Sequence, residues 1–334
     1  MPLLRLGTIL GHVLVWVFLL LATLWGSAAL WIDGPSPPWV AGLLAVAFAL
    51  GCLSLLLRVK HLRRGMLLML VPLAAVLTWW LSIPASNQRD WLPDVARTPY
   101  ATLNGALVTI HNIRDFEYRS SDTDFVEHWD TQTYDLEKVT GLDLFISYWG
   151  PTLYAHTIMS WEFADGRHLA ISIETRKERG EEYSALLGFF RQYELYYVVA
   201  SERDVIGVRT NHRGERVYLY RLRVRPEGAR ALLIQYLQEV NSLDRTPEWY
   251  NALATNCTTA IWHHIKVLAP ENPWDWRILV NGQLDEMIYE RGNVDTTLPF
   301  PEMRQRSDIT GKARAADSSP DFSRLIRAGL PGAR

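Results

Sequence analysis

The stretch Thr255-Asn256-Cys257-Thr258-Thr259 opens an apolar run that continues to Leu268 and is typical of a packed helix. Asn is a preferred N-cap residue, so we predict a helix whose first residue is Cys257. A thiol at that position lies at the positive end of the helix dipole, which lowers its pKa and favours the thiolate. The free backbone N–H groups of the first turn also suit an oxyanion. Cys257 is therefore a candidate nucleophile, and the alternative is a small thiol that packs a helix end.

The first quarter of the 334-residue chain contains three long apolar runs. Asp, Glu, Lys and Arg are absent from 6–32, 34–57 and 65–88. A helix needs about 20 apolar residues to cross a hydrocarbon core of about 30 Å, and each run is long enough. A cleaved signal peptide would account for the first run alone. We predict a membrane domain over 1–88, with transmembrane helices near 9–31, 39–57 and 66–83.

The loops between these runs predict an orientation. The second loop carries the basic residues Arg58, Lys60, Arg63 and Arg64, whereas the first loop, 33–38, carries none. Cytoplasmic loops are enriched in Lys and Arg, so the second loop and the N-terminus are expected in the cytoplasm. The third span then delivers the remaining chain across the membrane. We expect a bacterial inner-membrane protein whose large domain is periplasmic.

Residues 90–300 have the composition of a globular domain, which we expect to be α+β, with an antiparallel sheet packed against a few helices. The turn Ala164-Asp165-Gly166-Arg167 predicts a hairpin between 153–163 and 168–175. The segment 136–149 suits either a helix or a strand. Further strands are predicted at 103–110, 194–200, 204–209 and 216–222, and helices at 184–191 and 226–242. The polar tail, 301–334, is expected to be flexible.

Composition and motifs exclude several classes of function. The net charge of −2 gives no basic surface for nucleic acid. The chain has no phosphate-binding glycine loop and no Cys-x-x-Cys pair, so no cofactor is expected. Adjacent His263 and His264 point to different faces of a helix, and no other histidines have the spacing of a metal site. We therefore predict no metal.

A cysteine nucleophile needs a base, usually a histidine held by a third polar group. His156 is the best candidate, because it lies in the first strand of the predicted hairpin. A turn centred near residue 165 places Glu174 opposite His156 on the second strand. Ser172, one pleat away, is the other candidate to orient the imidazole. A packed strand histidine remains the alternative for His156.

Several spaced motifs occur in a characteristic order. They are His156-Thr157-Ile158-Met159-Ser160-Trp161, Ser172-Ile173-Glu174-Thr175-Arg176, Arg191-Gln192-Tyr193-Glu194-Leu195, Asp204-Val205-Ile206-Gly207-Val208-Arg209, and Tyr250-Asn251 with Asn256-Cys257-Thr258-Thr259, together with the segment 108–116 that contains Asn112 and Arg114. These motifs cover roughly residues 105–270 and are more specific in their order than any one of them alone. They resemble the periplasmic domain of the lipoprotein N-acyltransferase B (Lnb) family.

The resemblance implies a permuted papain-like thiol fold, in which His precedes Cys, and a thiol acyltransferase that acts on lipid-anchored proteins in the membrane. The acyl chain would move from the diacylglyceryl group of a lipoprotein to its N-terminal amine and leave a lyso-form product. Cys257 would form the thioester and His156 would be the base. Asn256 and the Cys257 N–H are candidates to bind the oxyanion, and Arg176, Asn112 and Arg114 are candidates to shape the pocket or bind a head group. The three preceding spans depart from the family pattern, in which the soluble domain comes first.

Two other functions use the same residues. A cysteine peptidase or amidase of cell-envelope peptides would pass the acyl group to water instead of an amine. A non-catalytic envelope module would need no contact between Cys257 and His156. An apolar groove of acyl size beside Cys257 would favour acyl transfer, whereas an open polar cleft would favour a peptidase.

Overall fold

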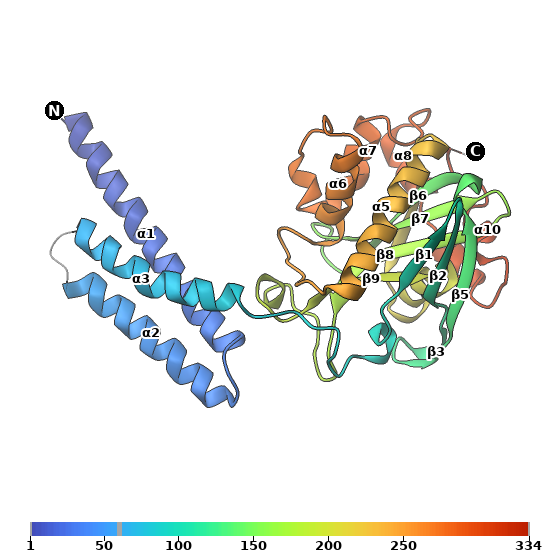
Figure 1. Ribbon diagram of the computed structural model, residues 1–334. Coiled ribbons are helices and arrows are strands. Elements are labelled where there is room, and N and C mark those ends of the chain that lie inside the picture. Colours follow the sequence, from blue (N-terminus) through green and yellow to red (C-terminus); the bar gives the residue numbers. More distant parts are fainter. Residues whose placement is uncertain (1, 59–61, 333–334) are drawn as a thin grey trace. The chain divides into compact units, whose positions relative to one another are not determined.

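A computed structural model describes residues 2–58 and 62–332 (Figure 1). The chain divides into two compact units. The helical unit comprises the chain up to Ala85 together with Ser184–Tyr193. The globular unit comprises Ser86–Tyr183 and the chain from Glu194 onward.

The helical unit contains the three apolar helices expected from the sequence: α1 (Pro2–Ile32), α2 (Pro38–Arg58) and α3 (Leu62–Leu81). Their apolar windows, Leu10–Ile32, Pro38–Leu57 and Arg64–Leu81, are long enough to cross a membrane. Lys60 of the predicted basic loop lies outside the described residues.

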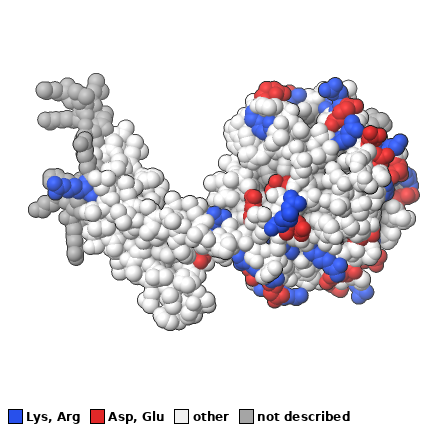
Figure 2. All heavy atoms as spheres, in the orientation of Figure 1, with Lys and Arg blue, Asp and Glu red and all other residues white. Residues whose placement is uncertain are grey.

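Packing among these helices buries little of their apolar surface. A small cluster of Leu19, Cys52, Leu56 and Met69 lies between them. Many other large apolar side chains stay exposed, and Figure 2 shows an almost uncharged surface over the helices. An exposed apolar surface of this extent is typical of helices that lie in lipid.

The segment Ser184–Tyr193 belongs to the helical unit because it binds the end of α1. The carboxylate of Asp33 accepts hydrogen bonds from Trp80 Nε1 at 2.6 Å and Gln192 Nε2 at 2.8 Å, and from the backbone N–H of Arg191. The Arg191 guanidinium also lies over the Trp80 ring. Of the helix predicted at 184–191, only a single 3₁₀ turn at Leu187–Phe189 forms.

The core of the globular unit is an eight-stranded sheet with the order β1-β2-β9-β8-β7-β6-β10, in which β5 also pairs with β2. All pairings are antiparallel except the single contact between β2 and β9. The strands of this sheet are β1 (Tyr100–Asn104), β2 (Leu107–Arg114), β5 (Trp129–Asp135), β6 (Val139–Tyr148), β7 (His156–Phe163), β8 (His168–Arg176), β9 (Glu194–Ala200) and β10 (Arg216–Arg221). A separate hairpin pairs β3 (Glu117–Ser121) with β4 (Asp124–Val126).

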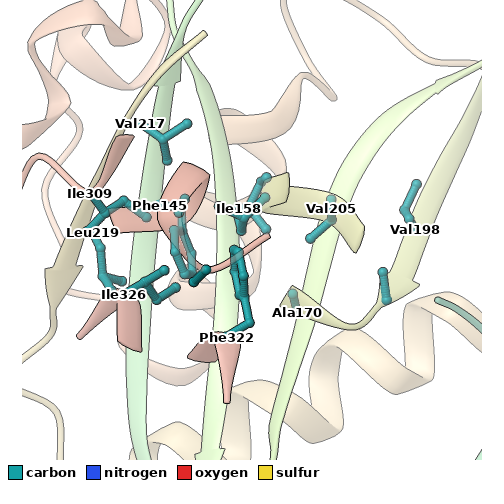
Figure 3. Packing of buried hydrophobic residues seen from close by; sticks show 14 of the residues in the cluster. Phe145, Ile158, Ala170, Val198, Val205, Val217, Leu219, Ile309, Phe322 and Ile326 are labelled. Atoms are coloured by element: carbon teal, nitrogen blue, oxygen red, sulfur yellow. The ribbon is translucent and has the colours of Figure 1, made fainter. Parts of the chain in front are cut away.

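Helices cover both faces of this sheet. The long helix α5 lies across the strands, with α6 and α7 beside it (Figure 1). Shorter helices pack on the other face, where Val205 of α4 and Phe322 of α10 meet Phe145 and Ile158 of the sheet (Figure 3). The helices of this unit are α4 (Glu202–Gly207), α5 (Pro226–Arg245), α6 (Cys257–Leu268), α7 (Leu284–Glu290), α8 (Phe300–Arg306), α9 (Thr310–Ala315) and α10 (Phe322–Ile326).

The C-terminal tail differs from the sequence prediction of a flexible segment over 301–334. It forms α8, α9 and α10, and its apolar side chains Ile309, Ala313, Phe322 and Ile326 are fully buried in the core (Figure 3). These few apolar residues, spaced through a polar sequence, are sufficient to anchor the tail because they join the buried cluster that also contains Phe145, Ile158 and Leu219 of the sheet.

Most other predicted elements are present, and the α+β class is confirmed. The 153–175 hairpin, the strands at 194–200 and 216–222 and the helix at 226–242 all form. The segment 136–149 becomes strand β6. The predicted strand at 204–209 is wrong, because Ser201 caps a helical turn there that continues as a π-helix over Val208–His212. The strand predicted at 103–110 is instead a hairpin that turns at Gly105, whose φ of 62° suits glycine. The permuted papain-type arrangement stays a prediction.

Candidate active site

Cys257 is the first residue of α6, as the sequence predicts. The Asn256 side chain accepts hydrogen bonds from the N–H groups of Thr258 and Thr259, and the Asn256 N–H donates one to the Thr259 hydroxyl oxygen. This reciprocal cap satisfies donors that a helix start otherwise leaves unpaired. It also fixes Cys257, a free thiol that is only 8% exposed, at the positive end of the helix dipole.

His156 is the first residue of β7, and its imidazole is close enough to the Cys257 thiol for each group to shift the pKa of the other. On its other side, His156 Nε2 lies 2.7 Å from the Ser172 hydroxyl. The Ser172 hydroxyl uses its one hydrogen to donate to Glu174 Oε1 at 2.7 Å, so it accepts a hydrogen bond from His156 Nε2–H. The neutral ring is therefore protonated on Nε2, and Nδ1 is free to accept a proton from the thiol. This is the tautomer that a general base requires.

Glu174 is held in place by an ion pair with Arg209, which also pairs with Glu215. Its Oε1 lies 2.9 Å from Arg209 Nη2 and 3.6 Å from His156 Nε2. Arg209 also binds Glu215 at 3.2 Å, and Glu215 accepts a hydrogen bond from Ser147. Both Arg209 and Glu215 are buried. The carboxylate behind the imidazole therefore has a fixed position and a fixed charge.

These contacts shift the ionisation of the pair in opposite directions. Burial opposes the thiolate, but the charge and hydrogen bond of His156 outweigh it and lower the pKa of Cys257 to about 6. Burial and Arg209 disfavour the imidazolium, but Cys257 and Glu174 outweigh them and raise the pKa of His156. Burial is also outweighed at Glu174, where Arg209 holds the pKa well below its usual value. Near neutral pH, the geometry favours a thiolate–imidazolium pair.

Asn281 also reaches the thiol, although no motif in the sequence pointed to it. Its side chain forms two hydrogen bonds with the backbone of Ala155, the residue before His156. Oδ1 accepts from the Ala155 N–H at 2.8 Å, and Nδ2 donates to the Ala155 carbonyl at 2.7 Å. The same Nδ2 lies 3.6 Å from Cys257 Sγ. The next residue, Gly282, lies against the loop before β7, where a Cβ atom would come within 1.9 Å of the Thr152 carbonyl. Only glycine permits this close approach.

The structure brings together Cys257, His156, Ser172, Glu174 and Asn256 of the predicted site residues. Asn256 acts as the helix cap, and its amide N–H donates to the Ala252 carbonyl rather than facing the thiol. The backbone N–H of Cys257 has no partner within the described chain.

The three other predicted residues hold the segment that follows the membrane helices. Arg176 lies against Trp91 and donates to the carbonyls of Val95 and Ala96. Arg114 pairs with Asp204 at 2.8 Å and donates to the Asp94 carbonyl. Asn112, whose φ is 59°, donates to the Thr98 carbonyl. In these positions they order the segment 94–98 and do not line the space around Cys257.

Arg209, Glu215 and Asn281 are residues that sequence reasoning did not assign to the site. Arg209 stands at the end of one motif that resembles the Lnb family, which was the only signal for it. Among residues 2–58 and 62–332, no group of three or more His, Cys, Asp and Glu side chains has the arrangement of a metal site.

Residues 125–282 match the family model described as the Lnb N-terminal periplasmic domain. This part of the chain belongs to the Lnb family. The matched range begins before β5 and ends at Gly282, so it contains Cys257, His156, Glu174, Arg209 and Asn281. Neither the curated proteins nor the solved structures contain a match to the chain. The chain is therefore a membrane-anchored protein with a periplasmic domain of a family linked to lipoprotein modification.

Proposed function

We propose that this protein is a thiol-dependent acyltransferase that moves an acyl chain within bacterial lipoproteins. The observation that carries the proposal is the Cys257–His156 pair at the start of α6, backed by Ser172, Glu174 and Arg209. A low-pKa thiol beside an oriented imidazole is the arrangement that forms thioesters. Membership of the Lnb family and the three apolar helices support a lipid-anchored substrate over a soluble one.

In the first half-reaction, the Cys257 thiolate attacks the ester carbonyl of the diacylglyceryl group. The backbone N–H of Cys257, at the start of the helix, would donate to the oxyanion that develops. The C–O bond then breaks, and the His156 imidazolium gives its proton to the departing glycerol oxygen. The products are an acyl thioester on Cys257 and a lyso-lipoprotein.

In the second half-reaction, the N-terminal amine of the lipoprotein attacks the thioester. His156, now neutral, accepts a proton from the attacking nitrogen at Nδ1. The C–S bond breaks, and the thiolate and imidazolium are restored. The net result is one amide in place of one ester, with no cofactor or metal consumed.

We further propose that the N-terminus lies in the cytoplasm and the Lnb domain in the periplasm. Arg58 at the end of α2 and Arg63 and Arg64 at the start of α3 support this orientation, since the cytoplasmic ends of membrane helices carry an excess of Lys and Arg. The substrate amine and ester would then be at the outer surface of the inner membrane, where lipoproteins are anchored.

The test is mass spectrometry of lipoprotein N-termini in a bacterial host that lacks its own N-acylating enzyme. The wild-type chain is expected to produce an N-acyl lyso-form, and Cys257→Ala to leave the diacyl form unchanged. Cys52→Ala is the matched control, because Cys52 is the other free cysteine and lies between the membrane helices. The proposal fails if the wild-type chain yields no N-acyl product, and cell-envelope peptides would then be tested as substrates.

A further inference from the structure

A cavity of about 390 Å³ lies beside the candidate active site, between α6, α5, α7 and the sheet. One face of α6 forms its wall, with Thr258, Ile261, Ile265 and Leu268 at helical spacing. The volume lies within the range of about 300–1,000 Å³ that is typical of small-molecule sites. Figure 2 shows mostly uncharged surface around α6.

The lining of this cavity is almost entirely hydrocarbon. Leu142, Leu144 and Met159 form the floor from the sheet, and Leu232, Leu284 and Met287 close the sides. An apolar cavity gives water no hydrogen-bond partners, so it favours an apolar occupant. A peptide would leave its backbone N–H and C=O groups unpaired there, at a cost of several kcal/mol for each group.

The charged residues of the lining already have partners. Arg223 binds Asp295 at 3.2 Å, and Arg291 binds the Asn272 side chain at 3.3 Å. Neither guanidinium therefore requires an anionic ligand. The cavity can accept an alkyl chain without leaving a buried charge unpaired.

Thr258 connects the cavity to the nucleophile. It lines the cavity, follows Cys257 directly, and its hydroxyl lies 3.8 Å from Sγ. That hydroxyl accepts a hydrogen bond from Asn281 Nδ2 at 2.6 Å and lies 3.2 Å from the Thr157 hydroxyl. In a thioester on Cys257, the Thr258 hydroxyl would therefore lie between the first carbons of the acyl chain and the apolar cavity.

We propose that this cavity binds the acyl chain during transfer, which assigns the alkyl-binding subsite of the proposed function and rests on it. The volume of about 390 Å³ and the apolar lining suit an alkyl chain. The cavity is closed to peptides and open to saturated chains, so it selects an acyl donor from the membrane. The length of the cavity along α6 sets the preferred chain length.

The test uses the full chain with Cys257→Ala, in lipid nanodiscs, and a palmitic acid that carries a photoreactive diazirine near its end. After illumination, we expect the label on peptides that contain α6 or α7, with unlabelled palmitate competing for it. Ile265→Trp fills the cavity and should reduce this labelling at least about tenfold. Val267→Trp is the matched control, since Val267 is on the same helix but is exposed and outside the cavity.

Ala269→Trp is a second filling variant at a half-buried position, in case Ile265→Trp does not fold. Labelling of α6 and α7 that is unaffected by either filling variant, or label found only on the membrane helices, overturns the inference. The proposed function fails separately: the intact thiol would then give no N-acyl lipoprotein, although the probe still labels the cavity. If both proposals hold, Ile265→Trp with Cys257 intact yields N-acyl chains that are shorter than those of the wild type.

Discussion

Two buried arginines lie on the same face of the sheet, and each bridges two carboxylates. Arg327 binds Asp143 at 2.8 Å and Glu202 at 2.6 Å, and Ser160 donates to Glu202. Arg209 binds Glu174 and Glu215, with Ser147 donating to Glu215. The apolar row of Phe145 and Ile158 separates the two clusters.

The two clusters differ in where their hydrogen bonds lead. In the Arg327 cluster, the charges and the serine satisfy one another, and α10 is fixed to the sheet as a result. In the Arg209 cluster, Glu174 also accepts from Ser172, which binds His156 and so reaches Cys257. The same combination of side chains thus stabilises the fold in one place and holds a base beside a nucleophile in the other. A buried charged network becomes a candidate site when one of its chains of hydrogen bonds ends on a reactive group.

The largest expected effect is a difference in acyl-transfer activity between variants of Arg209 and Arg327. Arg209→Met and Arg327→Met should each lower the free energy of unfolding by about 3 kcal/mol, because each removes the guanidinium that bridges two carboxylates. Only Arg209→Met should also abolish acyl transfer by the molecules that remain folded, since it releases Glu174 from behind His156. Denaturant unfolding in detergent and activity per folded molecule measure the two effects.

Arg324→Met is the control for these variants. Arg324 pairs with Asp321 at the surface, where the two side chains are 72% and 58% exposed. Its substitution should change stability by less than about 1 kcal/mol. If folded Arg327→Met loses acyl transfer as completely as Arg209→Met does, the proposed difference between the two clusters is wrong.

The second expected effect is on the pH dependence of Cys257 alkylation. With Cys52→Ala as the background, alkylation of Cys257 should be slow below pH 6 and rise to a plateau above it, because the pKa of the thiol is lowered to about 6. In His156→Gln, the imidazolium no longer favours the thiolate, so the midpoint should move up towards about 8.5. Rates of reaction with iodoacetamide across this range measure both midpoints. Equal midpoints would show that His156 does not influence the thiol.

The smallest expected effect concerns the serines that connect each cluster to the sheet. Ser172→Ala removes the hydroxyl between His156 and Glu174 and should slow acyl transfer about fivefold, since a buried hydrogen bond contributes about 1 kcal/mol. Ser160→Ala removes the equivalent hydroxyl of the Arg327 cluster and should leave the rate of transfer unchanged. A similar rate for both variants would mean that Glu174 orients the imidazole without the serine.

Local signals in the sequence predicted the parts of the site that depend on local geometry. An N-cap residue fixes where a helix starts, so Cys257 was expected as its first residue. The position of a hairpin turn fixes the register, and the observed pairing of Ile158 with Ser172 agrees with the predicted placement of Glu174 opposite His156. The three apolar helices were equally clear, because membrane spans depend on length and composition.

Parts that depend on tertiary packing could not be predicted in the same way. Arg209 lies on a π-helical turn that was expected to be a strand, and Asn281 reaches Ala155 from more than a hundred residues away. The tail has too few apolar residues to reveal its helices, yet four of them complete the core. Arg114 and Arg176 were candidates through the family resemblance, but only the folded chain reveals that Arg114 pairs with Asp204 and that both arginines donate to backbone carbonyls of the segment 94–98.

The bridge from Arg209 to Glu174 and Glu215 has a consequence for the total charge of the site. Two carboxylates and one guanidinium leave one net negative charge beside Cys257 and His156. This value is the same for the thiol with neutral imidazole, for the thiolate with imidazolium, and for the thioester with neutral imidazole. Under the proposed mechanism, protons move within the site while its overall charge stays constant. The surrounding low-dielectric core therefore never has to accommodate an added ion during the reaction.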